Sequence, residues 1–221
     1  MLGKARHWLS QFGARYWPAV SFRWHEKLIG SGVLFGWVMV PYFWLQQHHQ
    51  GIRWVVQPGW LDQLVPFHPL WGLPYILLYP FSFLATLLLA NPADLRRWWL
   101  ANVLMPLPAW LCFYFVQTEY PRPNGGPWPW PYDAIVRLDA PLNVTPCLHS
   151  AYALIAALSL ERAFRTCWPA RAASWAITFA VLVSIVGIRQ HRVIDVGLGL
   201  LLAAAVWTWF RRAGDHLKHS L

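Results

Sequence analysis

The sequence predicts an all-α protein of the membrane, a polytopic bundle of six transmembrane helices preceded by an amphipathic helix at the membrane surface. Hydrophobic residues make up 57% of the 221 residues and charged residues only 12%, whereas soluble domains carry about 25% charged residues. The chain also contains 17 Trp residues, a residue type that favours the boundary between membrane and water. Long apolar runs alternate with short polar segments, as expected for several membrane crossings.

The first 27 residues predict an amphipathic helix. On a helical wheel Trp8 and Phe12 fall on one arc, and Lys4 and Arg15 fall on the other. Such a segment is typical of helices that lie on the cytoplasmic surface of a membrane. No small-residue cleavage site follows an apolar run, so we do not interpret the segment as a cleavable signal.

The membrane domain is expected over residues 28–212, followed by a cytoplasmic tail at 213–221. Its six expected spans cover residues 29–45, 70–90, 98–117, 149–160, 172–188 and 192–210. An extramembrane loop is expected at 46–69. A second, rich in Pro and Trp, is expected at 118–148 and either anchors at the interface or covers a site on that face.

The distribution of positive charge predicts the orientation. With six spans, thirteen of the 18 Lys and Arg residues fall on the side of the termini and five on the other side. Cytoplasmic loops carry the excess of positive charge, so both termini are expected in the cytoplasm, in a bacterial inner membrane, with the opposite face in the periplasm. The net charge of +9 follows this membrane pattern, and we therefore expect no nucleic-acid partner.

Polar residues gather where the expected fifth and sixth spans meet. His191 and Asp195 are four residues apart, which places them on one face if the segment is helical. A carboxylate in that position can fix the tautomer of an imidazole. Arg189 adds a guanidinium suited to phosphate oxygens. Each of these residues could instead have a purely structural role, as a charge that flanks a membrane span or as a residue at the start of a helix.

A second group stands at the outer end of the expected fourth span, in the run Pro146-Cys147-Leu148-His149-Ser150. His149 begins a helix, where free backbone N–H groups attract phosphate. Arg122, in the run Arg122-Pro123, lies in the loop before it. The expected topology brings both groups and Arg122 to the outer face, which favours a single site.

These motifs resemble those of the type-2 phosphatidic acid phosphatase superfamily, and they are nearer the inositol phosphorylceramide synthase-like branch. The similarity rests on Arg122-Pro123, Pro146-Cys147-Leu148-His149 and Gln190-His191 with Asp195, in that order on one membrane face. It covers roughly residues 60–210. Three positions depart from the family's motifs: Phe115, Cys147 and Ile185 stand where the family carries Lys, Ser and Arg.

The resemblance implies a metal-independent phosphatase or phosphotransferase without a cofactor, acting on a lipid phosphate or diphosphate at the outer face. His191 is then the nucleophile that forms a phosphohistidine, oriented by Asp195, and His149 is the general acid and base. The resemblance also implies a phosphate-binding group, with these members: Arg122, Arg189, Cys147 and Ser150.

Two other interpretations stay open. A metal-dependent membrane hydrolase could use His149, His191 and Asp195 as three ligands. A non-catalytic lipid-binding or transport protein could keep the fold while lacking the polar groups lost at the three departing positions. The sequence decides neither the lipid nor the acceptor of the phosphoryl group.

Overall fold

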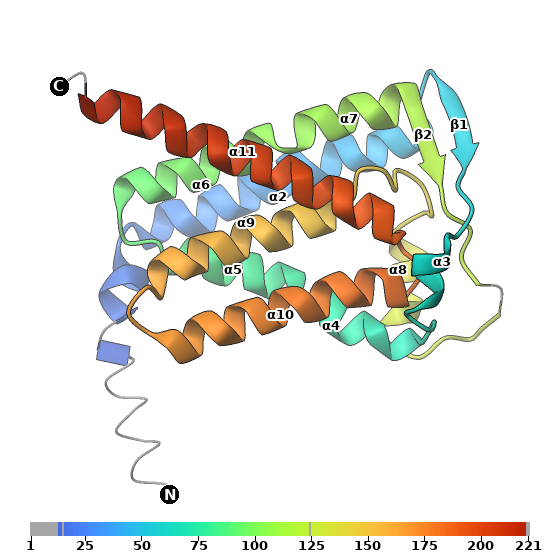
Figure 1. Cartoon of the computed structure of the whole chain (residues 1–221), viewed down its shortest axis with the longest axis horizontal. Helices are drawn as coiled ribbons and strands as arrows, with labels where there is room; N and C mark the ends of the chain where they lie inside the picture. The colour runs from blue at the N-terminus through green and yellow to red at the C-terminus, as the bar shows by residue number, and fades with distance from the viewer. Residues whose placement is uncertain (1–12, 15, 124, 220–221) are drawn as a thin grey trace, which may run out of the picture.

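The fold is a bundle of long helices with a small cap at one end (Figure 1). The structure is a computed structural model that describes residues 13–14, 16–123 and 125–219, with side chains described as far as Phe210. In that part of the chain the bundle consists of α2 (Trp24–Gln47), α4 (Gly72–Ile76) with α5 (Leu78–Leu88), α6 (Pro92–Leu104) with α7 (Pro106–Phe115), α9 (Leu148–Ala163), α10 (Trp168–Gly187) and α11 (Val193–His219). Residues 1–12 and 15 of the expected amphipathic helix lie outside the described residues.

Five helical stretches are long and apolar enough to cross a membrane. Among the described residues these stretches are Trp24–Gln47, Pro69–Leu88, Pro92–Phe115, Trp168–Gly187 and Val193–Phe210. They coincide with the first, second, third, fifth and sixth expected spans. The prediction of a mainly helical membrane protein is therefore confirmed at this level.

The expected fourth span, α9, differs from the others. It has 16 residues, which at 1.5 Å per residue extend about 24 Å, less than the roughly 30 Å of a bilayer's hydrocarbon core. It packs against α5, α6, α10 and α11, and Ala151, Ala153, Ala156 and Ala157 are fully buried. Small side chains let the neighbouring helices approach closely, so α9 is the central helix, covered by protein on most sides.

The short elements at one end of the bundle depart from the all-α prediction. Strands β1 (Ile52–Val55) and β2 (Val116–Glu119) form a parallel pair, because the third helical stretch ends at Phe115 and the chain continues extended. Alongside them lie α3 (Trp60–Gln63), the 3₁₀ turn η1 (Pro69–Trp71) and α8 (Tyr132–Leu138). The two expected loops are therefore partly ordered elements, and we call them together the cap.

Glycine permits one of the close contacts that hold the cap. The Gly51 and Gln50 N–H groups both donate to the carbonyl oxygen of Tyr114. A Cβ atom at Gly51 would lie 1.6 Å from the carbonyl oxygen of Phe115, so no larger residue fits there without moving the backbone. At the outer edge of the pair, Arg53 and Glu119 form an ion pair at 2.9 Å.

The cap lies at the opposite end of the bundle from the point where α2 begins and α11 ends (Figure 1). Helix α11 continues through His219, so the expected tail at 213–221 is helical as far as it is described. The turn between α10 and α11, the start of α9 and the segment 139–147 all meet beneath the cap. The residues singled out in the sequence are carried by these segments.

Candidate active site beneath the cap

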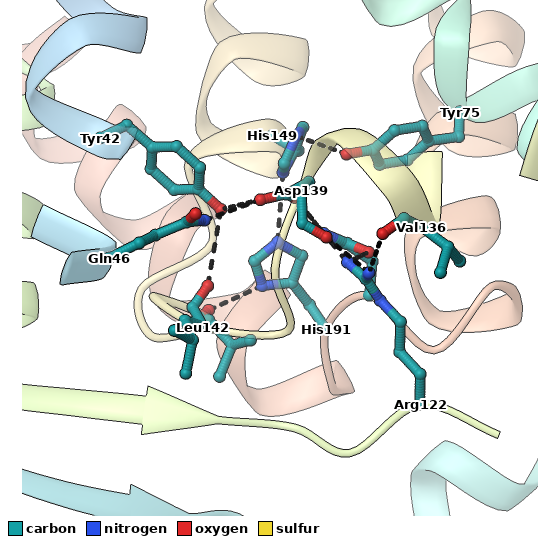
Figure 2. A network of polar contacts seen from close by, with 11 residues as sticks. Tyr42, Gln46, Tyr75, Arg122, Val136, Asp139, Leu142, His149 and His191 are labelled. Carbon is teal, nitrogen blue, oxygen red and sulfur yellow. Dashed lines mark hydrogen bonds and ion pairs between the residues drawn. The ribbon is translucent and has the colours of Figure 1, made fainter. Parts of the chain in front are cut away.

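Two histidine rings face each other at the centre of the site (Figure 2). His149 comes from the first turn of α9, and His191 comes from the turn before α11. His149 Nδ1 and His191 Nε2 are 3.1 Å apart. The structure therefore brings together the two residues that the sequence proposed as acid and nucleophile, although 41 residues separate them in the chain.

The outer nitrogen of each ring also has a partner, which fixes the proton positions. His191 Nδ1 lies 2.7 Å from the carbonyl oxygen of Val144, and His149 Nε2 lies 2.6 Å from the Tyr75 hydroxyl. A carbonyl oxygen can only accept, so His191 Nδ1 carries the proton and Nε2 of a neutral ring is a lone pair. His149 Nδ1–H then donates to that lone pair, and His149 Nε2 accepts from the Tyr75 hydroxyl.

The segment 143–145 presents the Val144 carbonyl, and β2 holds that segment in place. The Val144 and Thr145 N–H groups donate to the backbone oxygen and the hydroxyl of Thr118, at 3.4 and 2.9 Å. Asn143 adopts the left-handed region at φ 59°, and its Oδ1 accepts a hydrogen bond from Gln117 Nε2 at 3.2 Å. The backbone carbonyl at position 144 has no signature in the sequence, so sequence reasoning could not find this partner of His191.

Asp195 has a different role from the one that the sequence suggested. Its carboxylate accepts from the Thr145 hydroxyl and, at 2.9 Å, from the Arg192 backbone N–H, and the Arg192 guanidinium lies 3.3 Å away. Since His191 Nδ1 is bound to Val144, the expected contact between Asp195 and His191 is not met. Asp195 instead closes the first turn of α11, as an acidic residue three positions after the helix N-cap often does.

Arg122 lies beside the histidine pair and is nearly buried. Its Nη1 and Nη2 atoms donate at 2.6 Å to the Asp139 backbone oxygen and to Gln190 Oε1. Its side chain is 9% exposed, and its buried Nε–H has no hydrogen-bond partner among the described residues. A buried donor without a partner is uncommon in folded proteins, and here it belongs to a guanidinium that neighbours His191.

Asp139 is a site residue that sequence analysis missed. Its carboxylate accepts from the Tyr42 hydroxyl at 3.0 Å and from Gln46 Nε2 at 2.9 Å, and Gln190 Nε2 also donates to it. Arg122 Nη2 lies 3.9 Å from the carboxylate. Burial raises the pKa of Asp139, while the Arg122 charge opposes that rise. A lone acid in a loop carries no local signal, because its partners come from distant segments.

The proposed phosphate-binding set is only partly assembled. Arg189 turns away from the histidines and donates to the backbone oxygen of Asp62 at 2.6 Å. The Ser150 hydroxyl donates to the backbone oxygens of Cys147 and Val196, at 2.9 and 3.0 Å, and so joins α9 to α11. Cys147 is fully buried, and its Sγ atom accepts from the Ser150 N–H at 3.4 Å.

A candidate metal-ligand set exists, but it is not the one predicted. One ligand atom from each of Cys147, His149 and His191 lies within 4.8 Å of the others. The sequence had placed Asp195 in that set, and the structure puts Cys147 there instead because the Asp195 carboxylate is bound to Thr145 and Arg192.

An apolar cavity of about 880 Å³ runs along the helices to the site. It is lined by α2, α4, α5, α6, α8 and α9, with Asp139, Tyr75 and His149 at the cap end and Leu28 and Thr86 towards the far end. A long cavity of this kind can take a hydrocarbon chain, while its cap end offers the polar groups of the site.

The imidazole of His191 is neutral at physiological pH. Burial lowers its pKa to about 4, the Val144 carbonyl opposes that shift, and the Arg122 charge adds to it. A neutral imidazole with an unprotonated Nε2 is a nucleophile or a metal ligand once the hydrogen bond from His149 opens.

Comparisons with protein-family models, with curated proteins and with solved structures find no match to this chain. The resemblance to the type-2 phosphatidic acid phosphatases therefore rests on the three motifs alone.

Proposed function

We propose that the chain is an integral membrane phosphatase or phosphotransferase that acts on a lipid phosphate or diphosphate through a phosphohistidine on His191. The observation that carries this proposal is the ordered row of hydrogen bonds through the two rings. It leaves His191 Nε2 as a lone pair and His149 Nδ1 as its facing donor. A nucleophile and an acid that face each other are what transfer of a phosphoryl group to a side chain needs.

The first step joins His191 Nε2 to phosphorus and breaks the bond from phosphorus to the leaving oxygen. The substrate phosphate enters between the two rings, so the hydrogen bond between them opens. As the anionic phosphate binds, His149 takes up a proton on Nε2 and becomes an imidazolium, whose Nε2–H donates to the Tyr75 oxygen. The imidazolium gives its Nδ1 proton to the leaving oxygen, and the Nε2 proton is released when the product leaves. The Val144 carbonyl stabilises the positive charge that develops on the His191 ring.

The second step transfers the phosphoryl group to water or to another hydroxyl. His149 Nδ1 now takes the proton of the attacking group, the bond from phosphorus to His191 Nε2 breaks, and both rings return to their starting state. In both steps the unpartnered Nε–H of Arg122 is available to a phosphate oxygen. The carboxylate of Asp139 and the amide of Gln190 hold Arg122 in place.

The apolar cavity supports a lipid as the substrate. The cavity's cap end includes His149, and its walls are mostly aliphatic and aromatic side chains of the spans. A hydrocarbon chain in that cavity places an attached phosphate at the histidine pair.

The proposal includes the topology. We propose that α9 crosses the membrane as a sixth span, that residues 1–27 lie on the cytoplasmic surface, and that the cap faces the periplasm of a bacterial inner membrane. Thirteen of the 18 Lys and Arg residues support this orientation. Helix α2 begins and helix α11 ends at the same end of the bundle, opposite the cap, and this arrangement also supports the orientation.

The test is phosphate release by the purified protein in detergent, over phosphatidic acid, phosphatidylglycerol phosphate, undecaprenyl diphosphate and a sphingolipid phosphate. His191→Ala is expected to abolish turnover and labelling by a phosphorus-labelled substrate, a loss on the order of a thousandfold or more. His149→Ala is expected to slow turnover but to label still when the leaving group is activated, because such a group needs little protonation.

The matched control is His48→Ala, which removes an exposed histidine that stacks on Trp44. It is expected to keep full activity. Retained labelling in His191→Ala would show that the phosphohistidine is not on that residue. Absence of phosphate release from every lipid would favour the non-catalytic lipid-binding interpretation.

A further inference from the structure

A buried thiol, that of Cys147, lies beside the histidine pair. Cys147 Sγ and one nitrogen of each of His149 and His191 lie within 4.8 Å of one another. Thiolate and imidazole are the ligands that zinc and similar cations prefer in proteins. The proposed phosphoryl transfer uses both rings and leaves the thiol without a role.

The two ring nitrogens that face each other already have a separation that suits one ion. His149 Nδ1 and His191 Nε2 are 3.1 Å apart. Two imidazole nitrogens bound to one tetrahedral zinc at about 2.0–2.1 Å lie about 3.3 Å apart. The thiol lies within 4.8 Å of the ring nitrogens, so a cation bound by all three groups needs the sulfur and the rings to approach each other by up to about 1 Å.

The outer nitrogens have the partners that metal-binding histidines use. His191 Nδ1–H donates to the Val144 carbonyl, and His149 Nε2 meets the Tyr75 hydroxyl at 2.6 Å. Such outer partners fix the ring orientation and the tautomer of a ligand histidine. Both rings are thus held with one nitrogen outward and the other facing the second ring.

We propose that Cys147, His149 and His191 form a binding site for a thiophilic divalent cation, with zinc as the first candidate, and that the bound ion inhibits phosphoryl transfer. On binding, the Cys147 thiol releases its proton to solvent and the sulfur binds as thiolate. The His149 proton moves from Nδ1 to Nε2, where it donates to the Tyr75 oxygen. The three ligands leave a fourth position for water or a phosphate oxygen.

Inhibition follows because the ion takes the Nε2 lone pair of His191, which the first chemical step needs. This consequence rests on the proposed function, whereas the binding of the ion does not. The guanidinium of Arg122, which donates to Gln190 next to His191, repels a cation. Binding is therefore expected to be reversible by a chelator, as suits an inhibitory ion.

The experiment uses cobalt as a spectroscopic substitute for zinc in the purified full-length protein. Cobalt bound to a thiolate gives a charge-transfer absorption in the near ultraviolet, and the titration needs no turnover. The variant is Cys147→Ser. The control is Cys112→Ser, which changes an exposed thiol elsewhere in the chain.

The wild type and Cys112→Ser are expected to bind cobalt with this absorption, and the absorption is expected to disappear when zinc displaces the cobalt. Cys147→Ser is expected to lack the absorption and to bind at least about 10- to 100-fold more weakly. Zinc is expected to inhibit phosphate release by the wild type, and the ratio of rates with and without zinc should approach one in Cys147→Ser. His191→Gln serves as a second variant that removes a different ligand, in case Cys147→Ser does not fold.

An absorption that persists in Cys147→Ser, or never forms in the wild type, overturns the metal site. Zinc that accelerates phosphate release overturns the inhibitory role. If cobalt binds as expected but no lipid releases phosphate, the proposed function fails and the metal site stands.

Discussion

The contact between α9 and α11 allows a sharp test of how the site is held together. A Cβ atom at Gly199 would lie 2.1 Å from the Cys147 backbone oxygen and 2.3 Å from Ser150 Oγ. One contact is with backbone, and the Ser150 hydroxyl is fixed by two hydrogen bonds. Gly199→Ala must therefore push α11 away from the segment that carries Cys147 and His149.

Gly197 provides a matched control on the same helix, since a Cβ atom there meets nothing within 4 Å. Replacing a helical Gly by Ala without a clash stabilises by about 0.5–1 kcal/mol. Overpacking a close contact costs about 1–3 kcal/mol. The expected net effect is a loss of about 1–2 kcal/mol for Gly199→Ala and a gain of about 0.5–1 kcal/mol for Gly197→Ala.

The assay is thermal unfolding of both variants in the same detergent, followed by phosphate release. For a chain of this size 1 kcal/mol corresponds to about 2–4 °C in Tm, so the two midpoints are expected to differ by about 3–12 °C. Gly199→Ala is also expected to lower activity, because the displacement separates His149 from His191. Equal midpoints and equal activities for the two variants would refute the close approach of α9 and α11.

Two further predictions concern pH and topology. The pKa of His191 is lowered to about 4, so the folded protein binds fewer protons than the unfolded chain between about pH 4 and pH 6.5. The contribution of His191 to the stability of the fold is therefore complete above pH 6.5 and falls as the pH is lowered from 6.5 to 4. The pH profile of kcat/KM should show no acid limb from His191 near pH 6.5. A limb at that pH that disappears in a variant of His191 would contradict this prediction. The topology is tested with single cysteines in a chain whose exposed Cys112 is first changed to Ser. A cysteine at Ile52, which is 70% exposed, should react with an impermeant thiol reagent from outside intact cells, and one at the exposed Ala93 should not. The reverse labelling would place the cap in the cytoplasm.

The apolar pattern of the sequence was sufficient to predict the membrane helices. Each of the five long helical stretches coincides with an expected span, because hydropathy over about 20 residues is a property of the local sequence. The central helix α9 is the exception in length. It is covered by other helices, so its ends are set by its neighbours and by the cap rather than by the thickness of a bilayer.

The motifs also identified the two histidines, but they did not identify what orients them. The spacing of His191 and Asp195 predicted a contact within one turn, and it assumed that the helix already includes His191. Helix α11 begins at Val193, so His191 lies in the preceding turn, where its ring is free to reach Val144. Asp195 then satisfies the start of the helix and the Thr145 hydroxyl.

Only the tertiary structure decided the remaining partners of the site. Tyr75, Val144 and Asp139 come from three segments far from His191 in the chain, and two of them act through a hydroxyl or a backbone oxygen that no motif marks. A buried polar group must find its partner wherever the packed chain offers one. Sequence periodicity records which residues are buried, whereas the partner of each buried polar atom is fixed by the packing of distant segments.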